Sequence, residues 1–182
     1  MNSNRAKSFF SIATILGSLI TTPQDYAYSK TYLTINQAKQ VLFEGLKMES
    51  VDVTLTKEQM KSIRQSSKTR VRDSRMNVWR TNDGGWFIVD NVIGKHENID
   101  IAVALTKSGK VKGVEVLAYR ETFGYEVMNK KWLAQFLGRG HEKVLKLDED
   151  IKNISGATLS CRHITDGVNR LTHTWDQVLR HL

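Results

Sequence analysis

The sequence predicts an α+β fold, in which a mainly antiparallel sheet of about four strands packs with N-terminal helices and a long C-terminal helix. Three observations carry this prediction: helical periodicity ahead of the strands, four β-rich segments joined in pairs by turn clusters, and a long amphipathic segment at the end of the chain. Two helices, two hairpins and two more helices are an order typical of the α+β class. The 182 residues suit one domain with a short appendage.

Two helices are predicted between residues 30 and 75. The first spans Thr34–Leu46, where a good N-cap residue precedes apolar residues at helical spacing. The second begins at Thr56, and Gln59 three residues later completes a capping box. From Lys61 to Arg75, six basic residues stand against one acidic residue. We therefore expect residues 30–75 to form a helical, basic segment whose charged run lies on a solvated face or loop.

Four strands follow in two hairpins. Turn-forming clusters at residues 82–85 and 107–110 join them in pairs. The predicted strands are Met76–Thr81, Trp86–Ile93, Ile99–Leu105 and Val111–Tyr119. Trp79 and Trp86 are expected to pack the sheet against the helices, with stacking on a cofactor as the alternative.

Two further helices are predicted after the sheet. Asn129–Leu137 is short and apolar on one side, and Gly138 closes it. Ser160–Leu182 is long and carries a single apolar stripe at helical spacing. With the four strands, these helices form an expected domain over residues 76–182.

The first 29 residues are typical of a secretory signal peptide. Basic residues precede the charge-free run Phe9–Ile20, which ends before Pro23. The 12 residues of this run reach only about 18 Å as a helix, less than the roughly 30 Å hydrocarbon core of a membrane. Ala27 and Ser29 are small residues at the spacing of a cleavage site before Lys30. We therefore expect export, with an uncleaved anchor as the alternative.

The segment SGATLS at Ser155–Ser160 lies where an extended stretch meets the start of the last predicted helix. Its two small residues let the backbone approach a ligand closely, and three hydroxyl groups accompany the free N–H groups of a helix N-terminus. Such a place stabilises an anion, phosphate above all. Plain helix capping by the hydroxyl groups is the alternative.

Three segments together resemble the FMN-binding domain family, which includes the flavin subunits of the sodium-pumping NADH:quinone oxidoreductase and of its ferredoxin-linked relatives. SGATLS at Ser155–Ser160 resembles the family's flavinylation motif. GVEVL at Gly113–Leu117, followed by ETFG at Glu121–Gly124, resembles the family's strand and its Glu-Thr-Pro-Gly turn. WLAQFLG at Trp132–Gly138 is similar to the short helix after that turn. The resemblance covers roughly Ile99 to Val178, with order and spacing preserved.

In that family, the Thr of the motif bears FMN through a phosphoester that a separate flavin transferase installs. The resemblance implies that Thr158 is the acceptor hydroxyl and that Ser155 and Ser160 are further donors to the phosphate. Gly156 and Ala157 would then keep space for the phosphate and for the transferase. The residues implied to line the isoalloxazine ring are Glu121, Thr122, Gly124 and Tyr125.

Two positions depart from the family's pattern. Lys152 stands where the family usually has an Asp six residues before the acceptor Thr, although Asp148 and Asp150 lie close by. Phe123 replaces the usual Pro of the turn. Covalent attachment to Thr158 is the expectation, and tightly bound noncovalent FMN is the alternative.

No other pattern in the sequence indicates a different chemistry. The five histidines do not pair with one another or with Cys161 at helical spacing, so no metal site is predicted. The single cysteine excludes an internal disulfide. The sequence has neither a glycine-rich dinucleotide fingerprint nor a general acid–base constellation.

These features lead us to expect an exported flavoprotein in the periplasm or on the outer face of the cytoplasmic membrane. It would pass electrons to or from a membrane-bound reductase or respiratory complex, as a redox subunit rather than a stand-alone enzyme. The alternative is a noncatalytic FMN-binding sensor or docking module with noncovalent flavin.

The charge of the chain bears on its partners. With 27 Lys and Arg against 19 Asp and Glu, the formal charge is +8. Nucleic-acid binding is not expected, because export argues against it and no aromatic residue interrupts the basic run Lys61–Arg75. The run is instead expected to steer docking to an acidic redox partner or an anionic membrane surface.

Overall fold

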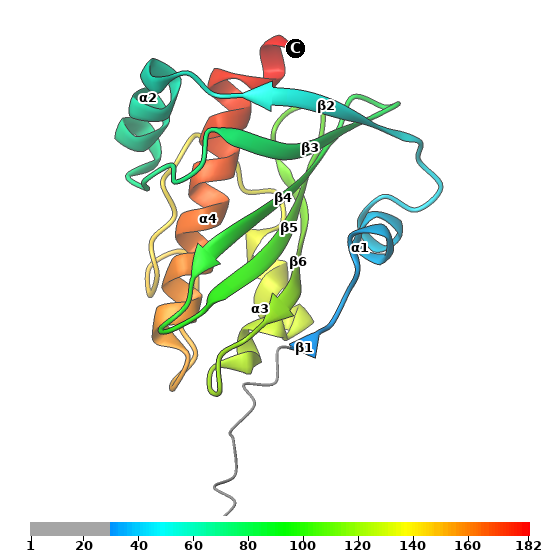
Figure 1. The fold of residues 1–182 in the computed structure, drawn as a ribbon. Helices are drawn as coiled ribbons and strands as arrows, with labels where there is room; N and C mark the ends of the chain where they lie inside the picture. The colour runs from blue at the N-terminus through cyan, green and yellow to red at the C-terminus, as the bar shows by residue number, and fades with distance from the viewer. Residues whose placement is uncertain (1–29) are drawn as a thin grey trace, which may run out of the picture.

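A six-stranded antiparallel sheet forms the centre of the fold, in the order β1-β6-β5-β4-β3-β2 (Figure 1). The computed structural model describes residues 30–182, so the signal peptide expected over residues 1–29 lies outside the described residues. The strands are β1 (Lys30–Thr31), β2 (Met48–Thr54), β3 (Arg75–Thr81), β4 (Trp86–Ile93), β5 (Asn98–Leu105) and β6 (Val111–Tyr119). The predicted α+β class is confirmed.

The four strands predicted from the sequence correspond to β3–β6, and β1 and β2 are additional. β2 pairs along its whole length with β3, but most of its residues are exposed or half-buried, because it is an edge strand. Its sequence MESVDVT therefore lacks the apolar content that predicts a central strand. β1 has two residues and pairs with the end of β6. Residues 30–75 thus contribute strands to the sheet as well as helices.

Both N-terminal helices begin where their capping residues predict. α1 (Ile35–Leu42) follows Thr34, and α2 (Lys57–Ser67) follows Thr56; each Thr forms a complete capping box with the Gln three residues later. α1 ends four residues before the predicted Leu46, and Gly45 then takes a left-handed φ of 73° that turns the chain toward β2. Three of the six basic residues of the run Lys61–Arg75 lie on α2 or at its C-cap: Lys61, Arg64 and Lys68.

The C-terminal half contains one short and one long helix. α3 (Lys130–Leu133) and the 3-10 helix η2 (Ala134–Phe136) lie within the single helix predicted over Asn129–Leu137, and another 3-10 helix, η1 (Tyr125–Met128), precedes them. α4 (Thr158–Gln177) begins two residues before the predicted start. The helix ends at Gln177, because the next residue, Val178, has a φ of −131° and a ψ of −62°, and η3 (Leu179–His181) follows.

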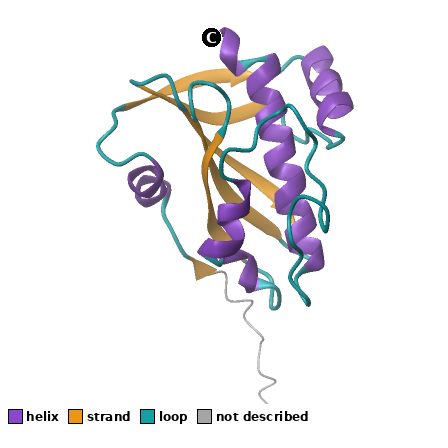
Figure 2. Cartoon of the chain, turned by 180° about the vertical axis from the view of Figure 1, so that it is seen from behind, coloured by secondary structure: helices purple, strands orange, loops and turns teal. Residues whose placement is uncertain are grey.

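The helices cover the two faces of the sheet unequally. α2, α3 and α4 pack on one face and α1 alone packs on the other (Figure 2). Trp86 is buried in the larger core on the α4 face, whereas Trp79 packs on the α1 face with its ring 5.6 Å from that of Phe87. Within residues 30–182, no helix combines the length and the apolar character needed to cross a membrane.

Candidate functional site

The chain enters α4 through a tight, exposed turn at residues 155–157. Gly156 has a φ of 86°, a conformation that glycine adopts without strain, and a Cβ placed there would meet no atom within 4 Å. Ser155 is exposed and Ala157 is buried against the core. The turn therefore leaves open space directly in front of the helix.

Thr158 is the first residue of α4 and is half-buried. Its hydroxyl oxygen accepts a hydrogen bond of 3.1 Å from Nδ2 of Asn153. Asn153 was not singled out from the sequence, because an amide five residues before a helix has no pattern of its own. This contact holds the Thr158 oxygen in one orientation at the edge of the open turn.

The first turn of α4 has no side-chain cap. Its N-cap residue is Ala157, which offers no acceptor to the first N–H groups, and no acidic residue lies in the first turn. These N–H groups carry the positive end of the helix dipole. A phosphate group fits this position, since it would supply the missing acceptors and a negative charge.

Tyr119, at the end of β6, joins the two segments that the sequence singled out. Its hydroxyl donates to the backbone oxygen of Phe123 at 2.5 Å and lies 2.9 Å from Oγ of Ser160. Burial raises the pKa of Tyr119, so it remains a neutral donor near neutral pH. Ser160 is buried with its hydroxyl on Tyr119, inside the protein rather than at the open turn. The turn after β6 and the start of α4 thus lie at the same end of the sheet (Figure 1).

Gly124 allows the turn after β6 to lie directly on this region. Its φ is 89°, and an added Cβ would come within 2.6 Å of the Tyr119 hydroxyl oxygen and 3.4 Å of Cβ of Ala157. A larger residue would push the turn away from α4. The structure therefore places Glu121–Gly124 beside Ser155–Ser160, as a shared site requires.

Glu121 turns its carboxylate toward the β4–β5 connection. Oε1 accepts hydrogen bonds from the backbone N–H groups of His96 at 2.5 Å and Glu97 at 3.0 Å. Partial burial opposes ionisation, but these backbone donors outweigh it and lower the pKa of Glu121. Glu121 thus holds two loops together at the site, and its charge is already satisfied by the protein.

Three large apolar side chains are exposed around the open turn. Phe123 is 80% exposed, Tyr125 57% and Leu159 42%. Thr122, between Glu121 and Phe123, is also exposed. Three exposed apolar side chains beside a helix N-terminus form a surface on which a flat aromatic ring can pack.

The two aspartates near Lys152, Asp148 and Asp150, differ in whether their carboxylates can contact another molecule. Lys152 is exposed, and its backbone oxygen accepts a 2.7 Å bond from the indole N–H of Trp132. Asp150 is held by the Lys143 ammonium group and by the backbone N–H of Lys146, which lower its pKa. Asp148 is exposed and is therefore the nearby carboxylate open to another molecule.

Metal and thiol chemistry have no support in the part of the chain that the structure describes. There, no group of three or more His, Cys, Asp or Glu side chains could hold a metal ion. Cys161 is fully buried, and burial raises the pKa of its thiol. A buried protonated thiol is a poor nucleophile, so Cys161 acts as a core side chain.

Comparison with known proteins identifies the region that contains this site. Residues 94–173 match the model of a family described as the FMN-binding domain. The matched region includes the turn at Glu121–Gly124, the segment Ser155–Ser160 and most of α4, and it confirms the resemblance found in the sequence. None of the curated proteins matches the chain.

Proposed function

We propose, from the premise that residues 94–173 are an FMN-binding domain and that FMN is its cofactor, that this protein is an exported electron-transfer flavoprotein that carries FMN on Thr158. The observation that carries the proposal is the position of the Thr158 hydroxyl. It lies at the uncapped N-terminus of α4, oriented by Asn153 and beside the open turn at Gly156. An acceptor for a phosphoryl group needs this combination of access and nearby N–H donors.

Attachment to Thr158 requires an activated flavin nucleotide, in which the FMN phosphate is part of a phosphoanhydride, delivered by a flavin transferase. The Thr158 oxygen forms the new P–O ester bond, and the anhydride P–O bond breaks. The departing phosphate group of the nucleotide takes up the hydroxyl proton. Gly156 leaves room for this approach, because no protein atom occupies the space that a side chain there would fill.

The protein's own residues then hold and orient the cofactor. The first N–H groups of α4 and the exposed Ser155 hydroxyl would bind the phosphate, while Phe123, Tyr125 and Leu159 would offer apolar surface to the ring. Bound FMN supplies the ability to accept and release electrons one or two at a time. Because these side chains are exposed, a ring packed on them would be accessible to a redox partner.

Export and the partner complete the proposal. The charge-free run near the N-terminus supports a signal peptide, which would place the protein in the periplasm or on the outer face of the cytoplasmic membrane. The expected partner there is a membrane-bound reductase or respiratory redox complex. A covalent bond suits that location, because lost cofactor could not readily be replaced outside the cytoplasm.

Intact-mass analysis after co-expression with a flavin transferase tests the attachment. The wild-type protein should gain the mass of one FMN, and Thr158→Ala should gain none. Ser155→Ala is the matched control, because it removes a neighbouring hydroxyl but leaves the acceptor and should still be loaded. Equal masses for wild type and Thr158→Ala, with no flavin retained after denaturation, would contradict the covalent bond.

Lys152 in place of the family's usual Asp favours a second candidate, a sensor or docking module with noncovalent FMN. Redox titration separates the two functions. Reversible reduction followed by fast oxidation by a membrane fraction supports the electron carrier. A flavin that exchanges no electrons with membranes supports the sensor.

A further inference from the structure

We infer that a basic groove along α4, next to the flavin site, is the docking surface for an acidic protein that exchanges electrons with the flavin. Its role in electron transfer rests on the proposed function, but the groove itself is a property of the described residues. We define the basic groove as the two adjoining clefts between α4 and the connector that runs from α2 to β3.

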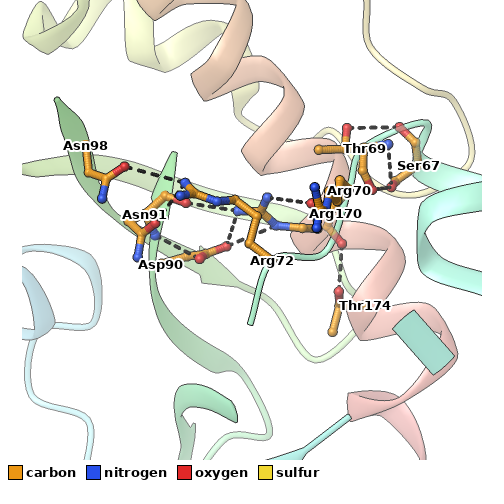
Figure 3. A network of polar contacts seen from close by, with 9 residues as sticks. All are labelled: Ser67, Thr69, Arg70, Arg72, Asp90, Asn91, Asn98, Arg170 and Thr174. Carbon is orange, nitrogen blue, oxygen red and sulfur yellow. Dashed lines mark hydrogen bonds and ion pairs between the residues drawn. The ribbon is translucent and has the colours of Figure 1, made fainter. Parts of the chain in front are cut away.

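The connector is held firmly against α4 (Figure 3). The guanidinium group of Arg170 is almost fully buried and donates to the backbone oxygen of Arg70 at 3.1 Å. It also donates to Oδ2 of Asp90 at 2.6 Å and to the backbone oxygen of Asn91 at 3.2 Å. Arg170 therefore ties three segments together and fixes the backbone from which the basic side chains project.

Two clefts make up the basic groove. One, of about 350 Å³, lies between the end of α2, α4 and residues 144–148; the other, of about 490 Å³, lies between residues 69–72, the end of β4 and α4. The basic residues that line them are Lys68, Lys146, Arg162, Arg70, Arg72 and Arg170, and the acidic ones are Asp148 and Asp166. The groove is therefore strongly positive.

Most of this positive charge is not neutralised by the protein. Arg170 pairs with Asp90 and Lys146 with Glu149. In the described chain, the remaining four basic residues form no ion pair with a carboxylate; they are Lys68, Arg70, Arg72 and Arg162. Within residues 30–182, the hydrogen bonds of the Arg72 side chain are two long ones, 3.4 and 3.5 Å, to side-chain oxygens of Asn91 and Asn98 (Figure 3). These groups are available to carboxylates of another molecule.

One acidic residue, Asp166, lies at the centre of the groove, and the six basic lining residues still outnumber the two acidic ones. Asp166 lines both clefts and is half-buried. Desolvation raises its pKa, against the attraction of His163, Arg162 and Arg170. The imidazole of His163 lines the second cleft, and its buried Nδ1 has no hydrogen-bond partner in the described chain.

The part of α4 that lines the basic groove follows the helix start that carries the flavin site. Arg162 lies four residues after Thr158, and His163 lies four residues after Leu159, so each pair shares a helix face. Four residues correspond to about 6 Å along the helix axis. The groove extends along α4 to Arg170, about 18 Å from Thr158, and its near end lies about one helical turn from Thr158. A protein that fills the groove and extends past its near end can therefore approach the cofactor.

The shape of the basic groove favours a protein over a lipid surface. Its unpaired guanidinium groups line concave clefts, which protruding Asp and Glu side chains can enter, whereas a bilayer surface is flat. An apolar centre with a charged rim is also the usual layout of a transient protein interface. Opposite charge accelerates encounter without requiring high affinity, as suits a carrier that must bind and leave.

Charge-reversal variants test the docking surface. The probe is an acidic [2Fe–2S] ferredoxin, and its association with the FMN-loaded protein is measured at low and at physiological ionic strength. Arg70→Glu/Arg72→Glu should slow association by on the order of tenfold or more at low salt. Lys47→Glu/Lys107→Glu is the matched control, because both lysines are exposed at the opposite end of the sheet and it changes the charge equally. Its effect should be less than about twofold.

Three further measurements settle the inference. Unfolding midpoints of both double variants should stay close to that of the wild type, which shows that any loss is electrostatic. Wild-type protein produced without the flavin transferase should bind the probe as the FMN-loaded protein does, so a failure of flavin attachment remains distinct from a failure of docking. The docking proposal would be overturned if both double variants lost the same fraction of the association rate, or if the wild type did not bind the probe at low salt. It would also be overturned if the wild type bound vesicles of phosphatidylcholine and phosphatidylglycerol in equal parts but did not bind the protein probe.

Discussion

The two ends of α4 lie in opposite environments. At its start, Leu159 is exposed, Thr158 is half-buried and no side chain caps the helix. Farther along, every residue from Gly167 to Trp175 is buried. One helix thus combines an open end that can hold a ligand with an embedded end that keeps it in place. An exposed site does not need a rigid loop of its own when the element that carries it is anchored elsewhere.

Specific contacts explain the anchoring of the embedded end. Gly167 lets α4 approach β4 so closely that an added Cβ would lie 2.6 Å from Cγ1 of Val92. Gly109, in the β5–β6 turn, packs directly under the ring of Trp175. The side chain of Asn169 makes two hydrogen bonds to the backbone of Leu145. At the open end, side-chain hydrogen bonds join Tyr119 to Ser160 and Asn153 to Thr158.

Truncation of Trp175 should have the largest effect on stability. Trp175→Ala removes a buried indole from the embedded end, and we expect a loss of about 3–5 kcal/mol in the free energy of unfolding. Leu159→Ala at the open end should cost about 0.5 kcal/mol or less. Urea unfolding of the flavin-free protein measures both. Similar losses at the two positions would show that the ends of α4 are not differently anchored.

Two glycines with left-handed backbone conformations allow a second comparison, one near the embedded end of α4 and one at its open end. Gly109 and Gly156 have φ values of 74° and 86°, so alanine is strained at either position. At Gly156 nothing surrounds the new methyl group, and we expect a cost of about 1 kcal/mol. At Gly109 the methyl group also overlaps the ring of Trp175, and we expect about 2–4 kcal/mol. Thermal unfolding compares the two variants, and equal costs would mean that backbone strain alone decides the outcome.

Loss of a side-chain amide should have an intermediate effect. Asn169→Ala leaves the buried backbone N–H and C=O groups of Leu145 without partners, at a cost of about 2 kcal/mol. Asn153→Ala removes one bond to the half-buried Thr158 and should cost about 0.5 kcal/mol. Hydrogen exchange at Leu145 provides a local readout. Unchanged protection of that amide in Asn169→Ala would contradict the assigned role.

Protonation of Glu121, at the open end, is expected to have the smallest effect on the free energy of unfolding. Backbone donors outweigh partial burial and lower the pKa of Glu121 in the folded protein, so its ionised form favours folding. This stability is fully present above the unfolded-state pKa, about 4.3, and is lost as the pH falls through the lower folded value. Glu121→Gln should therefore be less stable than the wild type at neutral pH, and the difference should shrink on acidification. A difference that stays constant to low pH would exclude ionisation as its source.

Local patterns in the sequence determined much of the fold. Both capping boxes place the starts of α1 and α2 correctly, because their hydrogen bonds join residues only three positions apart. The two hairpins follow from alternating apolar residues and turn clusters within one contiguous stretch. The edge strand β2 was missed, since it pairs with β3 residues that lie 21 to 33 positions away in the chain.

The candidate site shows the same division. The segments Ser155–Ser160 and Glu121–Gly124 were found from the sequence because each carries its own motif. Asn153 and Tyr119 were missed, although one orients the Thr158 hydroxyl and the other joins the two segments. A lone Asn or Tyr has no significance in the sequence until the fold brings its partner within hydrogen-bonding distance.

The sequence by itself predicted most of the element types and an anion at the start of α4, and it fixes the excess of positive charge. Only the tertiary structure decided which end of α4 is open and that the connector carrying Arg70 and Arg72 lies along this helix. The physical reason is the range of the interactions. Periodicity and capping act within a few residues, whereas Arg170 and Arg70 meet across 100 positions of the chain.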